Sequence, residues 1–148
     1  MNLSEHFTLE EFIATQHRGI DNRPSPLAFE NLKILASVLE DVRLLLGVPI
    51  LISSAYRCPD LNEAVGGSRN SRHMLGLAAD FIAPSYGSPI KVCKVISESQ
   101  IMYDQLILEF KRWVHFGLSE NGVQPRRQVL TIINPSQGYL SGIVGEVE

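Results

Sequence analysis

The stretch Ser71-Arg-His-Met-Leu-Gly-Leu-Ala-Ala-Asp80, which continues into Phe-Ile-Ala, sets a histidine and an aspartate seven positions apart among small and apolar residues. The run 77–83 has the composition of a strand that is at least half buried, and Asp80 lies in its middle. An ionised carboxylate is costly to bury unless a cation or several hydrogen-bond donors compensate its charge. We therefore expect a positive group beside Asp80.

The length and composition predict a single globular domain over residues 1–148. The chain has 148 residues, of which 45% are hydrophobic and 20% charged. The net charge of -3 argues against a protein that binds nucleic acid or a membrane surface by electrostatics, because such proteins carry a basic stripe. Apolar runs are shorter than the ~20 residues that span a bilayer, and the N-terminus lacks the pattern of a signal peptide. We expect a chain made in the cytoplasm without stable membrane insertion.

Helix signals dominate the first third of the sequence. Thr8 and Glu11 have the spacing of a capping box, in which the threonine accepts a backbone hydrogen bond and the glutamate reaches back. After a loop at 21–26, a longer helix begins at Pro26 and ends at Gly47. Its apolar residues recur near the helical period and form the expected core face: Leu32, Leu35, Ala36, Leu39, Val42 and Leu46. Shorter helices are expected after Cys58 and over 88–100.

The rest of the chain reads mainly as short strands separated by turns. The expected strands are 48–55, 77–83, 105–110, 113–118 and 128–133. Together with the helices they predict an α+β fold, with a mainly antiparallel sheet and helices packed on one side. We expect the core to span about 3–133 and the Gly-rich segment 134–148 to be a loosely held tail.

Histidine and cysteine positions narrow the candidate chemistry. His6 and His17 lie in an ordinary N-terminal region and are expected at the surface. Cys58 and Cys93 make no CxxC pair, so we expect two reduced thiols without a catalytic role. The fourth histidine, His115, lies within a predicted strand, where a single histidine is ordinarily structural.

The connection before that strand gives His115 an acidic neighbour. If residues 110–112 form a three-residue turn, Glu109 pairs with Trp113 and Ile107 with His115, so Glu109 and His115 share a face. A two-residue turn would send Glu109 to the opposite face, because a register shift of one residue exchanges the faces. The juxtaposition therefore depends on a connection of odd length.

Two histidines, a carboxylate and a further acid are the groups that a hydrolytic zinc site requires. Zinc takes three protein ligands in such sites and leaves the fourth position for water, whose pKa falls from about 15.7 towards ~7. His73, Asp80 and His115 would be the ligands and Glu109 the base. The metal would also supply the positive charge expected beside Asp80. Spacing alone leaves open a metal-free site in which Asp80 pairs with an arginine, Arg57 or Arg72.

The segment 53–81, SSAYRCPDLNEAVGGSRNSRHMLGLAADF, carries a more specific signal. It resembles the S-x-Y-R … S-x-H-x-x-G-x-A-x-D signature of the zinc D-alanyl-D-alanine carboxypeptidases and the related phage and bacterial peptidoglycan peptidases, which share the Hedgehog/D,D-peptidase fold. Together with the later WVH element, the resemblance covers roughly 3–118.

The resemblance implies roles for individual residues. One zinc ion would be held by His73, Asp80 and His115. Arg57 matches the arginine that holds a peptide carboxylate, a task suited to a planar guanidinium. Ser71 matches a position that contacts substrate in relatives, although a loop-forming serine explains it nearly as well.

The catalytic base is where the sequence departs from the family pattern. Many relatives carry an acid three positions before the last histidine and often another histidine two before it, whereas this chain has Arg112 and Trp113. The segment YDQLILEFKRWVH is instead similar to the Hedgehog signalling domain, in which a glutamate lies six positions before the zinc histidine. Glu109 occupies that position and is the expected base, with Asp104 in reserve.

Two classes of function remain open from the sequence. The first is a monomeric zinc peptidase that cuts peptidoglycan stem peptides or cross-links, made as a phage or prophage lysis enzyme and acting on the wall after release. D-Ala-D-Ala bonds, L-alanyl-D-glutamate bonds and cross-bridges are all compatible with it. The second is a non-catalytic zinc module that binds a partner, as Hedgehog domains do.

Overall fold

A long amphipathic helix, α2 (Pro26–Leu46), forms one wall of the hydrophobic core in this computed structural model, which describes residues 1–146. The hydroxyl of Ser25 accepts a hydrogen bond from the N–H of Ala28 at the start of the helix, and Gly47 ends it in the left-handed conformation. The predicted core face is buried together with Ala28. The preceding helix, α1 (Leu9–Ile13), begins with the predicted capping box.

Six strands form one sheet, and the fold class predicted from the sequence is confirmed. The strands are β1 (Leu51–Ser54), β2 (Ala78–Ile82), β3 (Gln105–Glu109), β4 (Trp113–Gly117), β5 (Gln128–Ile132) and β6 (Tyr139–Ser141). Their order is β1-β2-β4-β3-β5-β6, and every neighbouring pair is antiparallel except β3 and β5, which run parallel.

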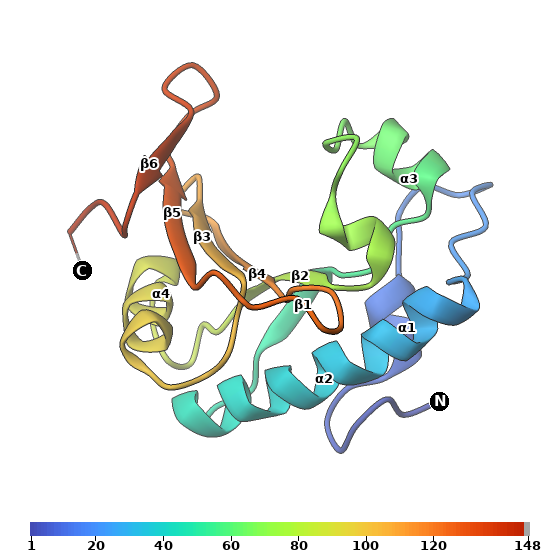
Figure 1. Ribbon diagram of the computed structural model, residues 1–148, viewed down its shortest axis with the longest axis horizontal. Coiled ribbons are helices and arrows are strands. Elements are labelled where there is room, and N and C mark those ends of the chain that lie inside the picture. The colour runs from blue at the N-terminus through green and yellow to red at the C-terminus, as the bar shows by residue number, and fades with distance from the viewer. Residues whose placement is uncertain (147–148) are drawn as a thin grey trace.

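The two faces of the sheet have different surroundings. One face packs in the core with α2 and α4 (Pro89–Glu98), through Phe81, Leu106, Leu108, Val114 and Phe116. Because side chains alternate along a strand, the residues between these point to the opposite face. On the side of that second face lie α3 (Pro59–Ala64) and a 3-10 helix, η1 (Arg72–Leu75), facing the β5–β6 hairpin across the sheet (Figure 1).

Two short elements were not predicted. The segment expected as a loosely held tail contributes β6, which extends the sheet by pairing Ile132 with Tyr139 and Leu130 with Ser141. The hydroxyl of Thr131 also donates to the carbonyl of Gly142 at 2.7 Å. A strand of three residues is too short to show an alternating pattern, and the four residues of η1 are likewise too few for a helical period. Residues 147–148 of the predicted tail lie outside the described part of the chain.

The N-terminal histidines and the two cysteines have the surroundings expected from the sequence. His6 and His17 are exposed. Both cysteines are free thiols: Cys58 accepts a hydrogen bond from the N–H of Leu61 at the start of α3, and burial raises the pKa of Cys93 to about 12. Within residues 1–146, no helix has the length and apolar character needed to cross a bilayer.

Candidate metal centre

Residues 71–76 form a tight turn that positions His73. The Oγ atom of Ser71 accepts a hydrogen bond from the N–H of His73 at 3.2 Å, and Gly76 closes the turn with a φ of 73°. A Cβ atom on Gly76 would lie 2.5 Å from the carbonyl oxygen of Ala28 in α2. Glycine is therefore favoured at this position for two reasons: the backbone is left-handed, and the turn packs closely against α2.

The hydrogen bonds of His73 determine which of its nitrogens faces the site. Its Nδ1 atom lies 2.6 Å from the carbonyl oxygen of Ala55. A carbonyl oxygen only accepts, so Nδ1 carries the proton and donates it. The lone pair is then on Nε2, which lies 3.4 Å from Oδ2 of Asp80. Metal-binding histidines commonly use this arrangement, because the second nitrogen fixes the ring orientation.

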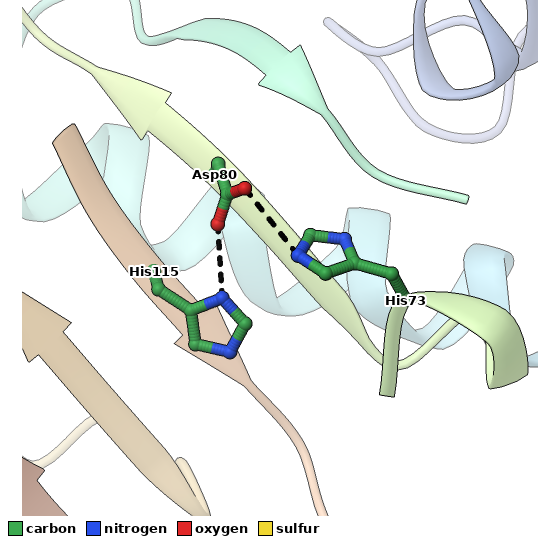
Figure 2. A group of neighbouring side chains, drawn as sticks. All are labelled: His73, Asp80 and His115. Atoms are coloured by element: carbon green, nitrogen blue, oxygen red, sulfur yellow. Dashed lines mark hydrogen bonds and ion pairs between the residues drawn. The ribbon is translucent and has the colours of Figure 1, made fainter. Parts of the chain in front are cut away.

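Asp80 lies between two imidazole rings that come from different parts of the sequence. It is the cross-strand partner of His115 in the pairing of β2 with β4, and its Oδ1 lies 2.9 Å from Nδ1 of His115. The other carboxylate oxygen faces His73, as Figure 2 shows. The pairing of β2 with β4, together with the η1 turn, thus brings together the three residues that the sequence predicted as ligands.

The geometry of this group fits a metal ion. One ligand atom from each of His73, Asp80 and His115 can be chosen so that all three lie within 4.8 Å of one another. Tetrahedral zinc ligands at about 2.0–2.2 Å from the ion are roughly 3.3–3.6 Å from one another. The group therefore needs only small side-chain adjustments to hold a metal.

Charges within the group also favour a cation. Burial by itself would raise the pKa of Asp80, but the charges and hydrogen bonds of His73 and His115 outweigh it and hold that pKa well below its usual range. Burial lowers the pKa of His73 and so favours the neutral ring that a metal binds. For His115, burial acts in the same direction, but the hydrogen bond that its ring donates to Asp80 and the negative charges of Asp80 and Glu109 prevail and raise the pKa. The carboxylate thus attracts a positive charge, which a proton on His115 or a metal ion can provide.

The predicted odd-length turn places Glu109 beside this group. Glu109 pairs with Trp113 and Ile107 with His115, as the three-residue connection requires. The turn is closed by a hydrogen bond of 2.9 Å from the N–H of Arg112 to the carbonyl of Glu109. Oε1 of Glu109 lies 3.6 Å from Nδ1 of His115, and burial raises the pKa of Glu109. A carboxyl group with a raised pKa can both accept and return a proton near neutrality.

The group opens into a cleft of about 760 Å³. Arg57 and Ser71 line this cleft with the three candidate ligands and Glu109. The Nε atom of Arg57 is buried and has no hydrogen-bond partner among the residues that the structure describes. A buried guanidinium donor without a partner is costly, so it favours a ligand that accepts a hydrogen bond.

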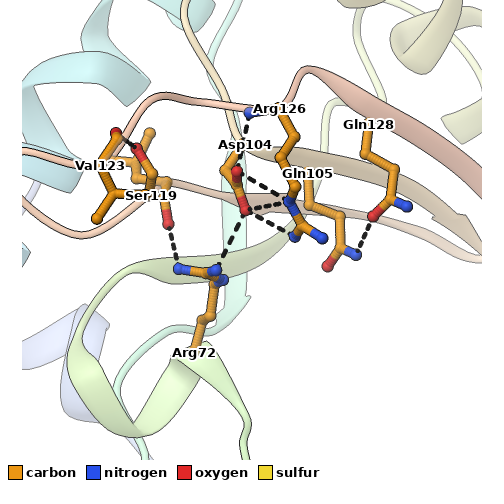
Figure 3. Close-up of polar contacts among 8 residues, drawn as sticks. Arg72, Asp104, Gln105, Ser119, Val123, Arg126 and Gln128 are labelled. Atoms are coloured by element: carbon orange, nitrogen blue, oxygen red, sulfur yellow. Dashed lines mark hydrogen bonds and ion pairs between the residues drawn. The ribbon is translucent and has the colours of Figure 1, made fainter.

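Asp104, the reserve base, lies in a different environment. It is 1% exposed, does not line the cleft and accepts hydrogen bonds from the backbone and guanidinium of Arg126 (Figure 3). Arg72 forms an ion pair with the same carboxylate. The metal-free alternative required Arg57 or Arg72 to pair with Asp80. Within residues 1–146, neither arginine lies within ion-pair distance of that carboxylate.

Several residues of the cleft were not recognised from the sequence. Trp113 shares the face of Glu109, and its place follows from the same odd-length turn, so the register signal was present. Its Nε1 atom is buried without a hydrogen-bond partner in the described chain. Arg126, Leu130 and Tyr139 also line the cleft, and no motif of the sequence pointed to them.

Comparison with known proteins supports the interpretation of the motif. A search of curated proteins finds no match. The family model described as peptidase M15 matches residues 5–117, a span that includes all three candidate ligands, Arg57 and Glu109. This match covers well over half of the chain and confirms the resemblance to the zinc D-alanyl-D-alanine carboxypeptidases. The chain therefore belongs to the peptidase M15 family.

Proposed function

We propose that this peptidase uses zinc to hydrolyse peptide bonds of peptidoglycan. The observation that carries the proposal is the group of His73, Asp80 and His115, with the carboxylate of Glu109 3.6 Å from one ligand nitrogen. An acid placed beside a three-ligand metal site at the base of a cleft is the arrangement that metal-assisted hydrolysis requires.

Each residue of the site would have a defined task. Nε2 of His73, the carboxylate of Asp80 and Nδ1 of His115 would hold the ion. Bound zinc lowers the pKa of a coordinated water and polarises the scissile carbonyl. Glu109 takes a proton from the attacking water and delivers it to the departing amine. Arg57 binds a carboxylate next to the scissile bond through its guanidinium and so orients the peptide.

The substrate class follows from Arg57 and from the family resemblance. D-Ala-D-Ala termini, L-alanyl-D-glutamate links and cross-bridges in peptidoglycan all present an amide next to a carboxylate, and each is compatible with such an anchor. We further propose that the protein acts as a monomer, as a phage or prophage lysis enzyme that reaches the wall after release. This setting rests on the resemblance of the motif region alone.

A digestion experiment tests the proposal directly. The purified protein is incubated with isolated peptidoglycan, with and without a zinc chelator, and the soluble fragments are identified by mass spectrometry. A new peptide terminus that the chelator abolishes supports the proposal and identifies the bond. An intact polymer together with zinc-loaded protein would refute it.

A second candidate function is a non-catalytic zinc module that binds a partner. The observation in its favour is Arg112, which stands where many relatives carry an acid. This candidate predicts bound zinc without cleavage of any wall fragment. The appearance of a zinc-dependent new amine in the digestion experiment would exclude it.

A further inference from the structure

We propose that the indole N–H of Trp113 donates a hydrogen bond to one carboxylate oxygen of Glu109 when the metal centre is loaded, which makes Trp113 a positioning residue for the base. The inference deepens the proposed function and rests on it for the role of Glu109. The hydrogen bond leaves the other carboxylate oxygen of Glu109 free to take a proton.

The pairing of β3 with β4 sets the two side chains beside each other. Glu109 and Trp113 are direct cross-strand partners, and both line the cleft. Side chains that are directly opposite in an antiparallel pair leave the sheet on the same face, with Cβ atoms about 4.5–5.5 Å apart. An indole ring at this separation is long enough for its N–H to reach the carboxylate opposite.

The indole N–H is a buried donor that lacks an acceptor. Within residues 1–146, Nε1 of Trp113 makes no hydrogen bond. The nitrogen of an indole can only donate, so only an acceptor can satisfy it. A buried polar group without a partner costs free energy, and folded proteins keep few of them. The N–H of Trp113 therefore favours an acceptor that turns towards it.

The surroundings of this N–H provide the carboxylate of Glu109 as that acceptor. Burial raises the pKa of Glu109, whereas the charge of His115 and the indole N–H of Trp113 both lower it. The N–H thus lies near enough to stabilise the ionised carboxylate, although it does not meet the distance and angle of a formed hydrogen bond. A rotation of the Glu109 side chain would complete the contact.

The present orientation of Glu109 explains why this hydrogen bond is not yet formed. Its Oε1 faces Nδ1 of His115 at 3.6 Å, and within residues 1–146 His115 is the only ion-pair partner of Glu109. When Nδ1 of His115 serves as a metal ligand, its lone pair is engaged and it has no hydrogen to donate. Glu109 then loses this partner, while Arg57 holds the substrate carboxylate in the proposed function. The indole N–H of Trp113 is the side-chain donor that remains on the paired strand.

The indole ring is held in place by its neighbour in the turn. Phe110 has a φ of 55°, in the left-handed region that bulky residues seldom adopt. The centroid of its ring lies 5.5 Å from that of Trp113, with an interplanar angle of 62°, which is a favourable edge-to-face arrangement. Strained backbone persists where the surrounding structure demands it, and it concentrates at functional sites. The turn thus presents the indole in a fixed orientation beside the base.

A fixed donor on one oxygen gives the carboxylate of Glu109 a defined direction. The oxygen that accepts from the indole stays engaged, so the proton from the attacking water goes to the other oxygen. Trp113 keeps its own proton throughout, because an indole only donates. Loss of the N–H should therefore slow the catalytic step and leave substrate binding and metal binding unchanged.

The first test observes the hydrogen bond itself. Trp113 is the only tryptophan of the chain, so the ¹H–¹⁵N NMR spectrum contains a single indole cross-peak. Addition of zinc to the metal-free wild-type protein should move this cross-peak downfield, because the N–H becomes bonded to a carboxylate. Glu109→Gln keeps the shape of the side chain but removes its charge, so the shift should be about half as large. Glu120→Gln, at an exposed position, should respond as the wild type does.

The second test separates the N–H from the bulk of the ring. Trp113→Phe keeps an aromatic ring beside Phe110 but has no donor. Its kcat for release of new amino groups from isolated peptidoglycan should fall about 10–100-fold, with unchanged KM and zinc content. Trp113→His should recover most of kcat, because Nε2 of an imidazole occupies the ring position of Nε1 in an indole. Tyr86→Phe is the control, since Tyr86 packs against Lys91 and does not line the cleft.

Several results would overturn the inference. They are an indole cross-peak that zinc moves equally in the wild type and in Glu109→Gln, a Trp113→Phe variant with the kcat of the wild type or a loss confined to KM, and an equal loss of kcat in Trp113→Phe and Trp113→His. The cross-peak decides the question even if the wild type cleaves no peptide or a Trp113 variant does not fold. A shift that depends on zinc and Glu109 without cleavage refutes hydrolysis alone, whereas cleavage without the shift refutes the hydrogen bond alone.

Discussion

Arg72 and Asp104 connect the turn that carries His73 to the strand that carries His115. Nη2 of Arg72 lies 3.3 Å from Oδ2 of Asp104, and its Nη1 donates to the carbonyl of Leu118 at 3.1 Å (Figure 3). Arg72 directly precedes one candidate ligand, and Leu118 follows the other by three residues. This guanidinium therefore helps to set the separation of the two histidines, and Asp104 holds the guanidinium in place.

Removing the charge of Asp104 should destabilise the protein in a pH-dependent way. Hydrogen bonds from Arg126 lower the pKa of Asp104 below its usual value of 3.8, in spite of its burial. A carboxylate with a depressed pKa stabilises the fold above its unfolded pKa and loses this contribution as the pH falls. We expect Asp104→Asn to lower the free energy of unfolding by about 2 kcal/mol at pH 7. The difference from wild type should shrink below about pH 4.

Urea unfolding of chelator-treated proteins at pH 7, 5 and 3 measures this effect without interference from metal binding. Asp41→Asn is the control, since Asp41 is exposed and forms no ion pair within residues 1–146. An equal loss at pH 7 and pH 3 would contradict the electrostatic explanation.

Replacing Glu109 should separate catalysis from metal binding. Glu109→Gln preserves the shape of the side chain but removes the proton acceptor, so we expect kcat to fall by about 10²–10⁴-fold. Zinc content measured by elemental analysis should not change, because the ligands are His73, Asp80 and His115. Glu120→Gln, at an exposed position, is the control for general effects of the substitution. Undiminished turnover by the Glu109 variant would remove Glu109 from the mechanism.

Metal binding should be visible in the stability of the protein even if no substrate is cleaved. Free zinc at 100 times its Kd stabilises a folded protein by about 2.7 kcal/mol, which corresponds to a rise of about 5–10 °C in Tm at this chain length. His115→Ala should abolish the rise, and a chelator should reverse it in the wild type. His17→Ala, at an exposed histidine, should respond as the wild type does. An unchanged response of the His115 variant would show that zinc binds elsewhere.

Arg57 should act on substrate binding and leave the metal in place. Lysine retains the charge but cannot form two parallel hydrogen bonds, so Arg57→Lys should lower kcat/KM by about 10–100-fold, mainly through KM. The peptide found in the digestion experiment, compared as its free acid and its amide, provides the measurement. Arg69→Lys, in the exposed loop before η1, is the matched control. If the variant still prefers the acid to the amide by the wild-type ratio, Arg57 does not bind the carboxylate.

The parts of the site that the sequence predicted depend on local rules. The seven-residue spacing of His73 and Asp80 lies within one motif, and the parity of a single turn places Glu109 on the face of His115. Neither relationship depends on contacts with distant parts of the chain. The core face of α2 was predictable for the same reason, since its period is local.

The parts that the sequence did not predict depend on contacts between distant segments. Asp104 directly precedes β3 and Glu109 is its last residue, and the environments of the two acids differ because Arg72 and Arg126, from distant segments, neutralise Asp104. The parallel pairing of β5 with β3 determines that Leu130 and Tyr139 reach the cleft. No local pattern encodes such a pairing, because each strand is compatible with several neighbours.

A comparison of Gly76 with Gly47 tests whether packing against α2 positions the turn around His73. Gly76 has a φ of 73° and would place a Cβ atom 2.5 Å from the carbonyl oxygen of Ala28. Gly47 has nearly the same φ, 71°, but a Cβ atom there meets nothing within 4 Å in the described chain. Gly47→Ala should therefore cost only the conformational penalty of about 1–2 kcal/mol.

Gly76→Ala should cost more than this, because the turn must also move away from α2. A displaced turn shifts His73, so we expect weaker zinc binding in addition to the lower stability, whereas the Gly47 variant keeps its zinc affinity. Urea unfolding and zinc titration of the two variants provide the comparison. Equal losses of stability in both variants, with unchanged zinc affinity, would show that the contact with Ala28 does not position the metal ligand.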